Sequence, residues 1–337
     1  MRKHHFVASK SARHAQRGLS LIELLVAVAI NLIIVIAVMY LYLGTRESQR
    51  ALDQVAQANE VGVFALRSLG REVMNAGFYP SAGTEDGLTV ITTYSRAREA
   101  TVPTGAAYDS GIFGCEGAAF DVGAGACEAT VANAADGLVV AYFTNDAFGA
   151  AGGQRVDCNG TDVGTATPNL PRVGAGASNQ PPAKPLMVAN HYRLGAPKEV
   201  VIDGQTVTMR SLECSGNASP DYQSVVAGID DFQVTYGVYA DEDRAPLRFY
   251  TATEVAALGP VTIKEKIVPA WGRVTSVRIC VIARTYESAA RQRDSTGATR
   301  AWKKCDGSTQ AQAAGDQSIR KNYTQVFGMR NFLNATY

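Results

Sequence analysis

The pattern of hydrophobic and polar residues divides the chain into a basic start, a long apolar run and a mixed remainder. Among the twenty residues from Leu24 to Leu43, Asn31 is the only strongly polar one. At about 1.5 Å per residue a helix of this length spans roughly 30 Å, the thickness of a bilayer core. Neither Pro nor Gly interrupts residues 19–43. The pattern therefore predicts one straight membrane-spanning helix.

The residues before this run carry only positive charge. Residues 1–18 contain five basic residues and no acidic one. Positive residues stay on the cytoplasmic side, so we expect a single-pass inner-membrane protein with a cytoplasmic N-terminus and a periplasmic head. A secretory signal peptide would have a shorter apolar run followed by a small-residue cleavage site, and no such site follows Leu43. A plain uncleaved anchor is a second alternative, which leaves Gly18 and Glu23 unexplained.

The polar and apolar positions after residue 44 predict that the helix continues beyond the membrane. No Pro occurs from Thr45 to Ala76, and Gly77 is a suitable C-terminal stop. One helical face is predicted by residues that recur at three- and four-residue intervals: Leu52, Val55, Asn59, Gly62, Val63, Leu66, Leu69 and Val73. Leu19 to Ala76 would then form one helix of about 85 Å. Two independent helices are the alternative.

From Phe78 onward the pattern changes to short β-rich runs between Gly-rich loops. Strands are predicted within residues 88–94, 138–144, 188–192, 200–207, 225–239, 274–286 and 325–332. Asp203-Gly204 predicts a hairpin turn, residues 253–258 a helical turn, and residues 145–185 a long surface excursion. The expected fold class is α+β, with the long N-terminal helix packed on a mostly antiparallel sheet.

These patterns predict four segments. Residues 1–18 form the basic leader, residues 19–43 the transmembrane helix, residues 44–77 its amphipathic continuation, and residues 78–337 a β-rich head.

Six cysteines all lie beyond the apolar run, at Cys115, Cys127, Cys158, Cys214, Cys280 and Cys305. An even number on the exported side predicts a set of disulfides, although six cysteines allow fifteen pairings. We favour Cys115–Cys127 and Cys280–Cys305, which close short loops, and Cys158–Cys214, which could tie two strand ends. Neither a C-x-x-C motif nor a Cys/His cluster with metal spacing is present, so we expect no metal site.

Composition and motifs give no indication of catalysis or of nucleic-acid binding. The net charge is +1, and without residues 1–18 there are 27 basic and 31 acidic residues. His4, His5 and His14 lie in the leader, and we expect His191 to be structural. Nucleotide, metalloprotease and serine-hydrolase motifs are lacking, so we expect no cofactor and no enzyme activity. The acidic clusters Asp230-Asp231 and Asp241-Glu242-Asp243 do not have calcium-loop spacing, and we expect solvated turns there.

Glu23 is the one carboxylate at the start of the apolar run. An unpaired carboxylate in lipid or a packed helix bundle costs several kcal/mol, so it is rarely present without a role. The amine of a neighbouring subunit could neutralise it and so fix one axial register between the two chains. The alternative is that Glu23 extends to the lipid headgroups without a partner.

The residues Gly18-Leu19-Ser20-Leu21-Ile22-Glu23 resemble the class III signal of type IV pilins and pseudopilins. The resemblance implies that a prepilin peptidase cuts between Gly18 and Leu19 and that Leu19 is then N-methylated. Glu23 becomes the fifth residue of the mature chain. Leu19 stands where major pilins usually have Phe, and the mid-helix Pro of many major pilins is missing.

Two head segments, residues 225–237 and 271–279, resemble stretches of the PilW family of minor pilins. The resemblance implies a non-enzymatic subunit that joins other minor pilins and the major pilin in an initiating complex. It would sit near the fibre tip, with a tip adhesin as a further partner, and support twitching, adhesion or DNA uptake. A J-type pseudopilin of type II secretion is the closest alternative. A membrane-anchored exported hydrolase is another, and it would need a catalytic constellation in the head.

Overall fold

The computed structural model describes residues 20–78, 108, 110–144, 156–163, 186–202, 205–240, 245–263, 266–286, 301–312, 316 and 318–333. The chain divides into two compact units, Met1–Ala51 and Leu52–Tyr337. Gly18 and Leu19 lie outside the described residues, as do the strand predicted at 88–94, the acidic run 241–243 and most of the excursion predicted at 145–185.

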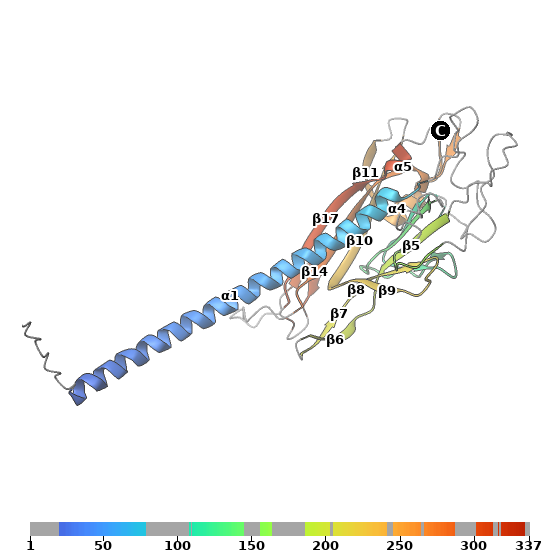
Figure 1. The fold of residues 1–337 in the computed structure, drawn as a ribbon. Helices are drawn as coiled ribbons and strands as arrows, with labels where there is room; N and C mark the ends of the chain where they lie inside the picture. The colour runs from blue at the N-terminus through green and yellow to red at the C-terminus, as the bar shows by residue number, and fades with distance from the viewer. Residues whose placement is uncertain are drawn as a thin grey trace, which may run out of the picture. The chain divides into compact units, whose positions relative to one another are not determined.

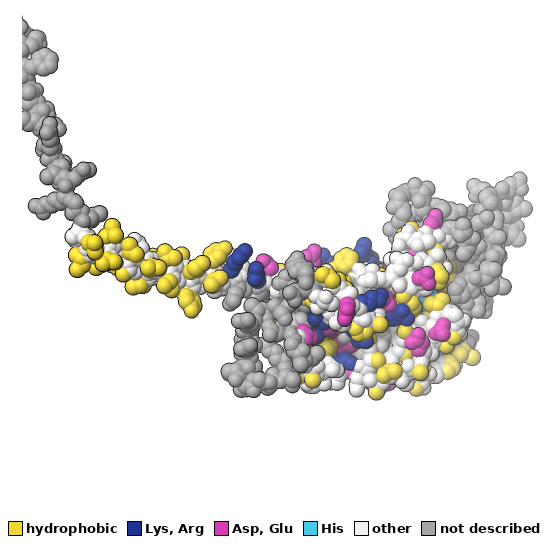
Figure 2. Space-filling view, turned by 90° about the horizontal axis from the view of Figure 1, so that it is seen from below, with side chains coloured by type: hydrophobic (Ala, Val, Ile, Leu, Met, Phe, Trp, Pro, Cys, Tyr) yellow, Lys and Arg dark blue, Asp and Glu magenta, His cyan; other side chains and the backbone are white. Residues whose placement is uncertain are grey.

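Helix α1 runs without interruption from Leu21 to Asn75 and belongs to both units (Figure 1). The prediction of one long helix is confirmed, and the alternative of two helices is wrong. Its first part displays hydrophobic side chains on its surface (Figure 2). By length and composition it is long and apolar enough to cross a membrane. Gly77, with φ of +69°, follows the helix and has the left-handed conformation typical of a helix end.

Two antiparallel sheets form the body of the second unit. The five-stranded sheet has the order β1-β4-β5-β8-β9 and consists of β1 (Ile112–Cys115), β4 (Gly137–Thr144), β5 (Leu186–Leu194), β8 (Ser211–Gly216) and β9 (Gln223–Ala227). The four-stranded sheet has the order β11-β10-β14-β17 and consists of β10 (Ile229–Tyr239), β11 (Pro246–Tyr250), β14 (Val274–Arg284) and β17 (Arg320–Gly328). The predicted α+β class is confirmed.

Smaller elements surround these sheets. Among the described residues, two-stranded ribbons pair β2 (Phe120–Asp121) with β3 (Ala126–Cys127), β6 (Lys198–Ile202) with β7 (Gln205–Met209), β12 (Val261–Ile263) with β13 (Lys266–Val268), and β15 (Ala301–Lys303) with β16 (Thr309–Ala311). The β6–β7 pairing confirms the predicted hairpin, whose turn residues lie outside the described part. Short helices are α4 (Ala252–Ala257), a 3-10 turn (Trp271–Arg273) and α5 (Arg330–Leu333).

The long strand predicted within residues 225–239 is β10, and Gly228, with a φ of +81°, separates it from β9 and turns the chain from one sheet to the other. One strand prediction needs correction. The last strand does not reach residue 332. It ends at Gly328, and Arg330 begins the short helix α5.

The core of the second unit lies between α1 and the two sheets. Leu69 and Val73 of α1 are fully buried in one cluster with Leu212 of the five-stranded sheet and Ile279 of the four-stranded sheet. Of the positions predicted to form one helical face, Gly62, Leu66, Leu69 and Val73 are buried, whereas Leu52 and Val63 are exposed, so the prediction is right only for part of that face. Burial of the apolar area of these side chains holds the helix against the sheets.

Candidate functional site

The start of α1 is closed by a reciprocal pair of hydrogen bonds between Ser20 and Glu23. Glu23 Oε2 accepts from the Ser20 backbone N–H at 2.9 Å and from Ser20 Oγ at 3.1 Å. Ser20 Oγ in turn accepts from the Glu23 backbone N–H at 3.3 Å. This is the capping box, in which two otherwise unbonded N–H groups of the first turn are satisfied.

The capping box assigns Ser20 a role that the sequence interpretation missed. The signal was present, because Ser-x-x-Glu before an apolar run is the sequence signature of this motif. A cut between Gly18 and Leu19 would leave the Ser20 N–H as an ordinary amide, so the cap does not depend on the leader. Both bonds to the carboxylate use Oε2, which leaves Oε1 of Glu23 to accept from another group.

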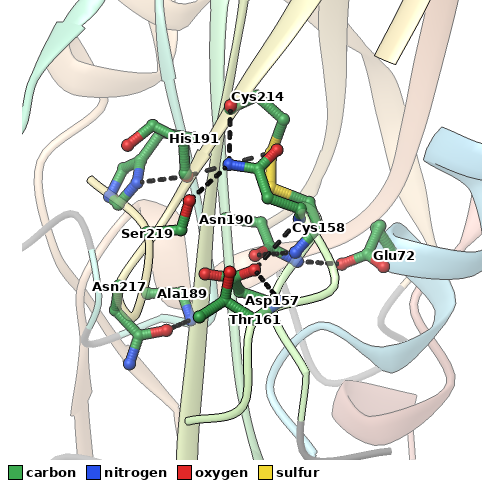
Figure 3. The surroundings of a disulfide bond; sticks show 12 residues. Glu72, Asp157, Cys158, Thr161, Ala189, Asn190, His191, Cys214, Asn217 and Ser219 are labelled. Carbon is green, nitrogen blue, oxygen red and sulfur yellow. Dashed lines mark hydrogen bonds between the residues drawn. A yellow bond between two sulfur atoms is a disulfide. The ribbon is translucent and has the colours of Figure 1, made fainter. Parts of the chain in front are cut away.

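A second polar site joins α1 to the five-stranded sheet (Figure 3). Glu72 of α1 accepts a hydrogen bond of 2.7 Å from Asn190 Nδ2 of β5, and Asn190 Oδ1 accepts from the Cys158 backbone N–H at 3.0 Å. Burial raises the pKa of Glu72, while the Asn190 hydrogen bond and the charge of Arg71 oppose that rise. The helix is therefore tied to the loop that carries Cys158 through one buried amide.

The six cysteines form three disulfides in the structure, Cys115–Cys127, Cys158–Cys214 and Cys280–Cys305. They are the same three pairs that we favoured from the sequence. Cys158 lies in a turn and not at a strand end, so it ties the 157–161 loop onto β8. Asn159 Nδ2 also donates to the Cys214 carbonyl at 3.2 Å and to Ser219 Oγ at 2.9 Å, which fixes the loop further.

His191 occupies a buried position with both ring nitrogens engaged. Nδ1 donates to the Ser215 carbonyl at 3.0 Å, so Nε2 accepts from the Tyr108 hydroxyl at 2.9 Å. Burial lowers the pKa of His191 to about 4, against the opposing effect of the Ser215 bond. A neutral, doubly bonded imidazole is a structural group rather than a proton carrier. Within the described residues no cluster of three His, Cys, Asp or Glu side chains is able to hold a metal ion.

Buried carboxylates connect the parts of the head. Asp136 accepts from the backbone N–H groups of Gly117 and Val234, both at 2.8 Å, and thereby links the turn after β1 to β10. Burial raises the pKa of Asp136 to about 7, against the effect of these two bonds. Asp231 accepts from the Cys305 backbone N–H at 2.8 Å and is 1% exposed.

The prediction of a solvated turn at Asp230-Asp231 is therefore wrong. Asp230, with a side chain that is 8% exposed, lies 2.6 Å from Arg320 Nε, and its other oxygen lies 3.8 Å from Arg284. Asp316 completes the group at 2.7 Å from Arg320. In sequence the pair looks like a surface turn, but the ends of β14 and β17 bring two guanidinium groups to it.

Two family models match this chain, one at the start of α1 and one in the head. The family described as "Type IV Pilus-assembly protein W" matches residues 199–331, and the "Prokaryotic N-terminal methylation motif" matches residues 13–39, which include Gly18, Leu19 and Glu23. No curated protein matches the chain. Among solved structures, a type IV-like pilin from Thermus thermophilus aligns at 12% identity over 59% of this chain and 79% of its own, with a TM-score of 0.27.

Proposed function

We propose that the chain is a minor pilin of the PilW family of type IV pilus-assembly proteins and that it helps to initiate pilus assembly. In this proposal it joins other minor pilins and the major pilin, takes a place at the fibre tip, and binds a tip adhesin there. Twitching, adhesion or DNA uptake would then depend on it. The family matches support a structural pilus protein, and the roles in initiation and at the fibre tip go beyond those matches.

One observation carries the proposal. Helix α1 joins an exposed apolar segment with a capped carboxylate, Glu23, to a segment whose Leu69 and Val73 are built into the core of a disulfide-bonded head. Removing the helix from the head would expose that core, so the apolar segment and the head act as one subunit. This is what an assembly protein needs if a membrane-anchored helix is to carry a head into a fibre.

We propose the following processing and division of the chain. A prepilin peptidase removes residues 1–18 by cutting between Gly18 and Leu19, and Leu19 is N-methylated. Residues 19–43 serve as the membrane and assembly helix, residues 44–77 continue that helix, and residues 78–337 form the head. Before assembly the head would lie in the periplasm and the basic leader in the cytoplasm.

A catalytic role has no support in the described head. His191, the histidine that a hydrolase would need there, is 1% exposed and bonded through both nitrogens. The J-type pseudopilin of type II secretion has less support than a pilus subunit, because the family match over residues 199–331 is to a pilus-assembly protein.

The test uses a strain that lacks the gene, complemented with the wild-type chain or with Gly18→Ala. We expect the wild type to restore surface pili and to yield a mature chain that starts with N-methyl-Leu19 by mass spectrometry. Gly18→Ala should keep its leader and fail to restore pili. A mature chain of normal size from Gly18→Ala would overturn the processing proposal. Normal pili in the deletion strain, with type II secretion lost, would overturn the pilus role and favour the pseudopilin.

A further inference from the structure

Strand β17 forms one edge of the four-stranded sheet (Figure 1). It pairs with β14 over its full nine residues, from Ser276↔Gly328 to Arg284↔Arg320, with no shift in register. Within the described part of the chain, no strand pairs with its other side. Most of its side chains are exposed, namely those of Lys321, Asn322, Thr324, Gln325 and Val326. Such an edge offers a row of backbone N–H and C=O groups to another chain.

The other sheet edges carry the usual protections against pairing. Strand β11 has five residues, starts at Pro246, and pairs with β10 across a register shift at Val238/Tyr239. Strand β1 has four residues. Strand β9 has five residues and pairs with β8 across a shift at Leu212/Glu213. Short length, proline and bulges are devices that keep edges from pairing, and β17 has none of them.

Helix α1 supplies an apolar side wall next to this edge. Gly62 packs on the ring of Tyr323 and Gly70 on the ring of Phe327, so α1 crosses directly over β17. Since successive helix residues are about 100° apart, Val63 lies on the opposite flank of α1 from Glu72, which faces β5. Val63 is 39% exposed. A strand added to β17 would therefore pack one of its faces against Val63.

Val326 gives the other face of the same edge an apolar side chain, which is 50% exposed. The exposed Arg278 of β14 does not contribute to this edge, because its guanidinium lies over the Phe249 ring of β11 at 3.8 Å and so points away from β17. Lys321 of β17 is exposed, and among the described residues of β14 and β17 only Arg284 and Arg320 are paired with carboxylates. A segment that carries a carboxylate next to Lys321 would match this charge.

We propose that an extended segment of another pilin subunit adds to the free edge of β17 as a further strand. Its backbone pairs with β17, its alternate apolar side chains contact Val63 and Val326, and a carboxylate lies beside Lys321. This is strand addition, in which the main chain gives affinity and the side-chain pockets give specificity. The inference rests on the proposed function, because the partner is a subunit of the same assembly.

Amide hydrogen exchange tests the pairing directly. The full chain is purified in detergent alone and after pairwise co-expression with the other prepilin-signal subunits of its organism. In an antiparallel ladder alternate N–H groups of an edge strand point away from its neighbour. We expect alternate amides of residues 320–328 to exchange rapidly in the free chain and about tenfold or more slowly in one of the complexes.

A pair of matched variants identifies the surface. Val326→Asp places a charge where an apolar side chain of the added strand would pack, and it should lower the recovery of the partner subunit about tenfold. Leu247→Asp changes a residue that is 71% exposed on the opposite edge, and it should leave recovery unchanged. Both variants should keep the thermal midpoint of the wild type, because neither side chain is buried.

Three outcomes would overturn the inference. A complex in which the β17 amides exchange as fast as in the free chain would contradict strand addition and leave the proposed function intact. Slow exchange of all β17 amides in the free chain would show that a segment of the same chain already covers the edge. If no subunit forms a complex with the full chain, the proposed function and this inference both fail.

Discussion

Glu72 on α1 accepts a hydrogen bond of 2.7 Å from Asn190 Nδ2 on β5, which joins helix and sheet across 118 residues of sequence. Asn190 is 1% exposed, and its Oδ1 accepts from the Cys158 backbone N–H. One amide therefore satisfies a carboxylate of the helix and a backbone group of the loop that is held by the Cys158–Cys214 disulfide. A buried group that serves two partners is expensive to remove, because both partners lose their hydrogen bond.

Asn190→Ala should destabilise the head by about 2–4 kcal/mol, since it leaves both the Glu72 carboxylate and the Cys158 N–H without a partner. Glu72→Gln keeps an acceptor for Asn190 and removes a carboxylate whose pKa is raised by burial. The free energy of unfolding should therefore fall less for Glu72→Gln than for Asn190→Ala. Urea denaturation of the purified full chain measures both. Gln325→Ala, at an exposed amide on β17, is the control and should have the wild-type midpoint. An unchanged midpoint for Asn190→Ala would show that the bond contributes nothing.

Asp136 should make the head more stable at acidic pH. Burial raises its pKa from 3.8 to about 7 in the folded chain, so between these pH values the folded chain binds a proton that the unfolded chain has lost. This contribution to stability is fully present below about pH 4 and is lost as the pH rises to 7. His191 acts in the opposite direction. Because its pKa falls from 6.5 to about 4, its contribution is present above pH 6.5 and is lost as the pH falls.

The two groups oppose each other between pH 4 and 6.5, and Asp136→Asn should reveal the histidine. We expect a nearly level free energy of unfolding for the wild type over this range. For Asp136→Asn we expect it to fall by about 1 kcal/mol for each unit of decreasing pH. Urea denaturation at several pH values gives both profiles. Parallel profiles would mean that Asp136 does not titrate as its burial requires.

The elements that hydrophobic periodicity defines could be predicted from the sequence. The three- and four-residue spacing of Leu66, Leu69 and Val73 predicted the buried face of α1, and the Asp-Gly turn predicted the β6–β7 hairpin. Both are local signals. The order β11-β10-β14-β17 is not local, because strands far apart in sequence become neighbours only when the core forms. The free edge at β17 follows from that order and could not be predicted.

The polar sites of the head were hidden for the same reason. Asn190 and Glu72 meet because β5 is brought next to α1, and nothing in their own neighbourhoods of the sequence indicates a contact. Asp231 looked like part of a solvated turn until the Cys280–Cys305 disulfide brought the Cys305 N–H to it. The Ser20–Glu23 cap, in contrast, is separated by three residues and could have been predicted.

Gly62→Ala should weaken the packing of α1 on the four-stranded sheet. A Cβ at Gly62 would overlap the ring of Tyr323, and that ring is held by a hydrogen bond of 2.6 Å from its hydroxyl to Asn59 Oδ1. Overpacking of this kind costs about 1–3 kcal/mol, which outweighs the gain of about 1 kcal/mol in helix propensity from Gly to Ala. Gly44→Ala is the matched control, because nothing lies within 4 Å of its Cβ position. The urea midpoint should fall for Gly62→Ala alone, and equal midpoints for the two variants would contradict the close packing.

Glu23 takes part in a helix cap and is proposed to pair with another subunit, and three variants separate the two roles. Ser20→Ala removes the hydroxyl from the cap and keeps the carboxylate, at a cost of about 0.5–2 kcal/mol in helix stability. Glu23→Gln keeps an acceptor for the cap and removes the charge, and Glu23→Ala removes both. The charge is proposed to pair with the new amine of a neighbouring chain, which is a step after cleavage. We therefore expect all three variants to lose their leader normally.

Co-purification of partner pilins from membranes then distinguishes the variants. Ser20→Ala should recover partners nearly as well as the wild type, while Glu23→Gln and Glu23→Ala should both recover few, because an amide cannot neutralise an ammonium group in an apolar surrounding. Recovery by Glu23→Gln that equals the wild type would assign Glu23 to the cap. Recovery by both Glu23 variants that equals the wild type would leave Glu23 with no part in assembly, as expected if it only extends to the lipid headgroups.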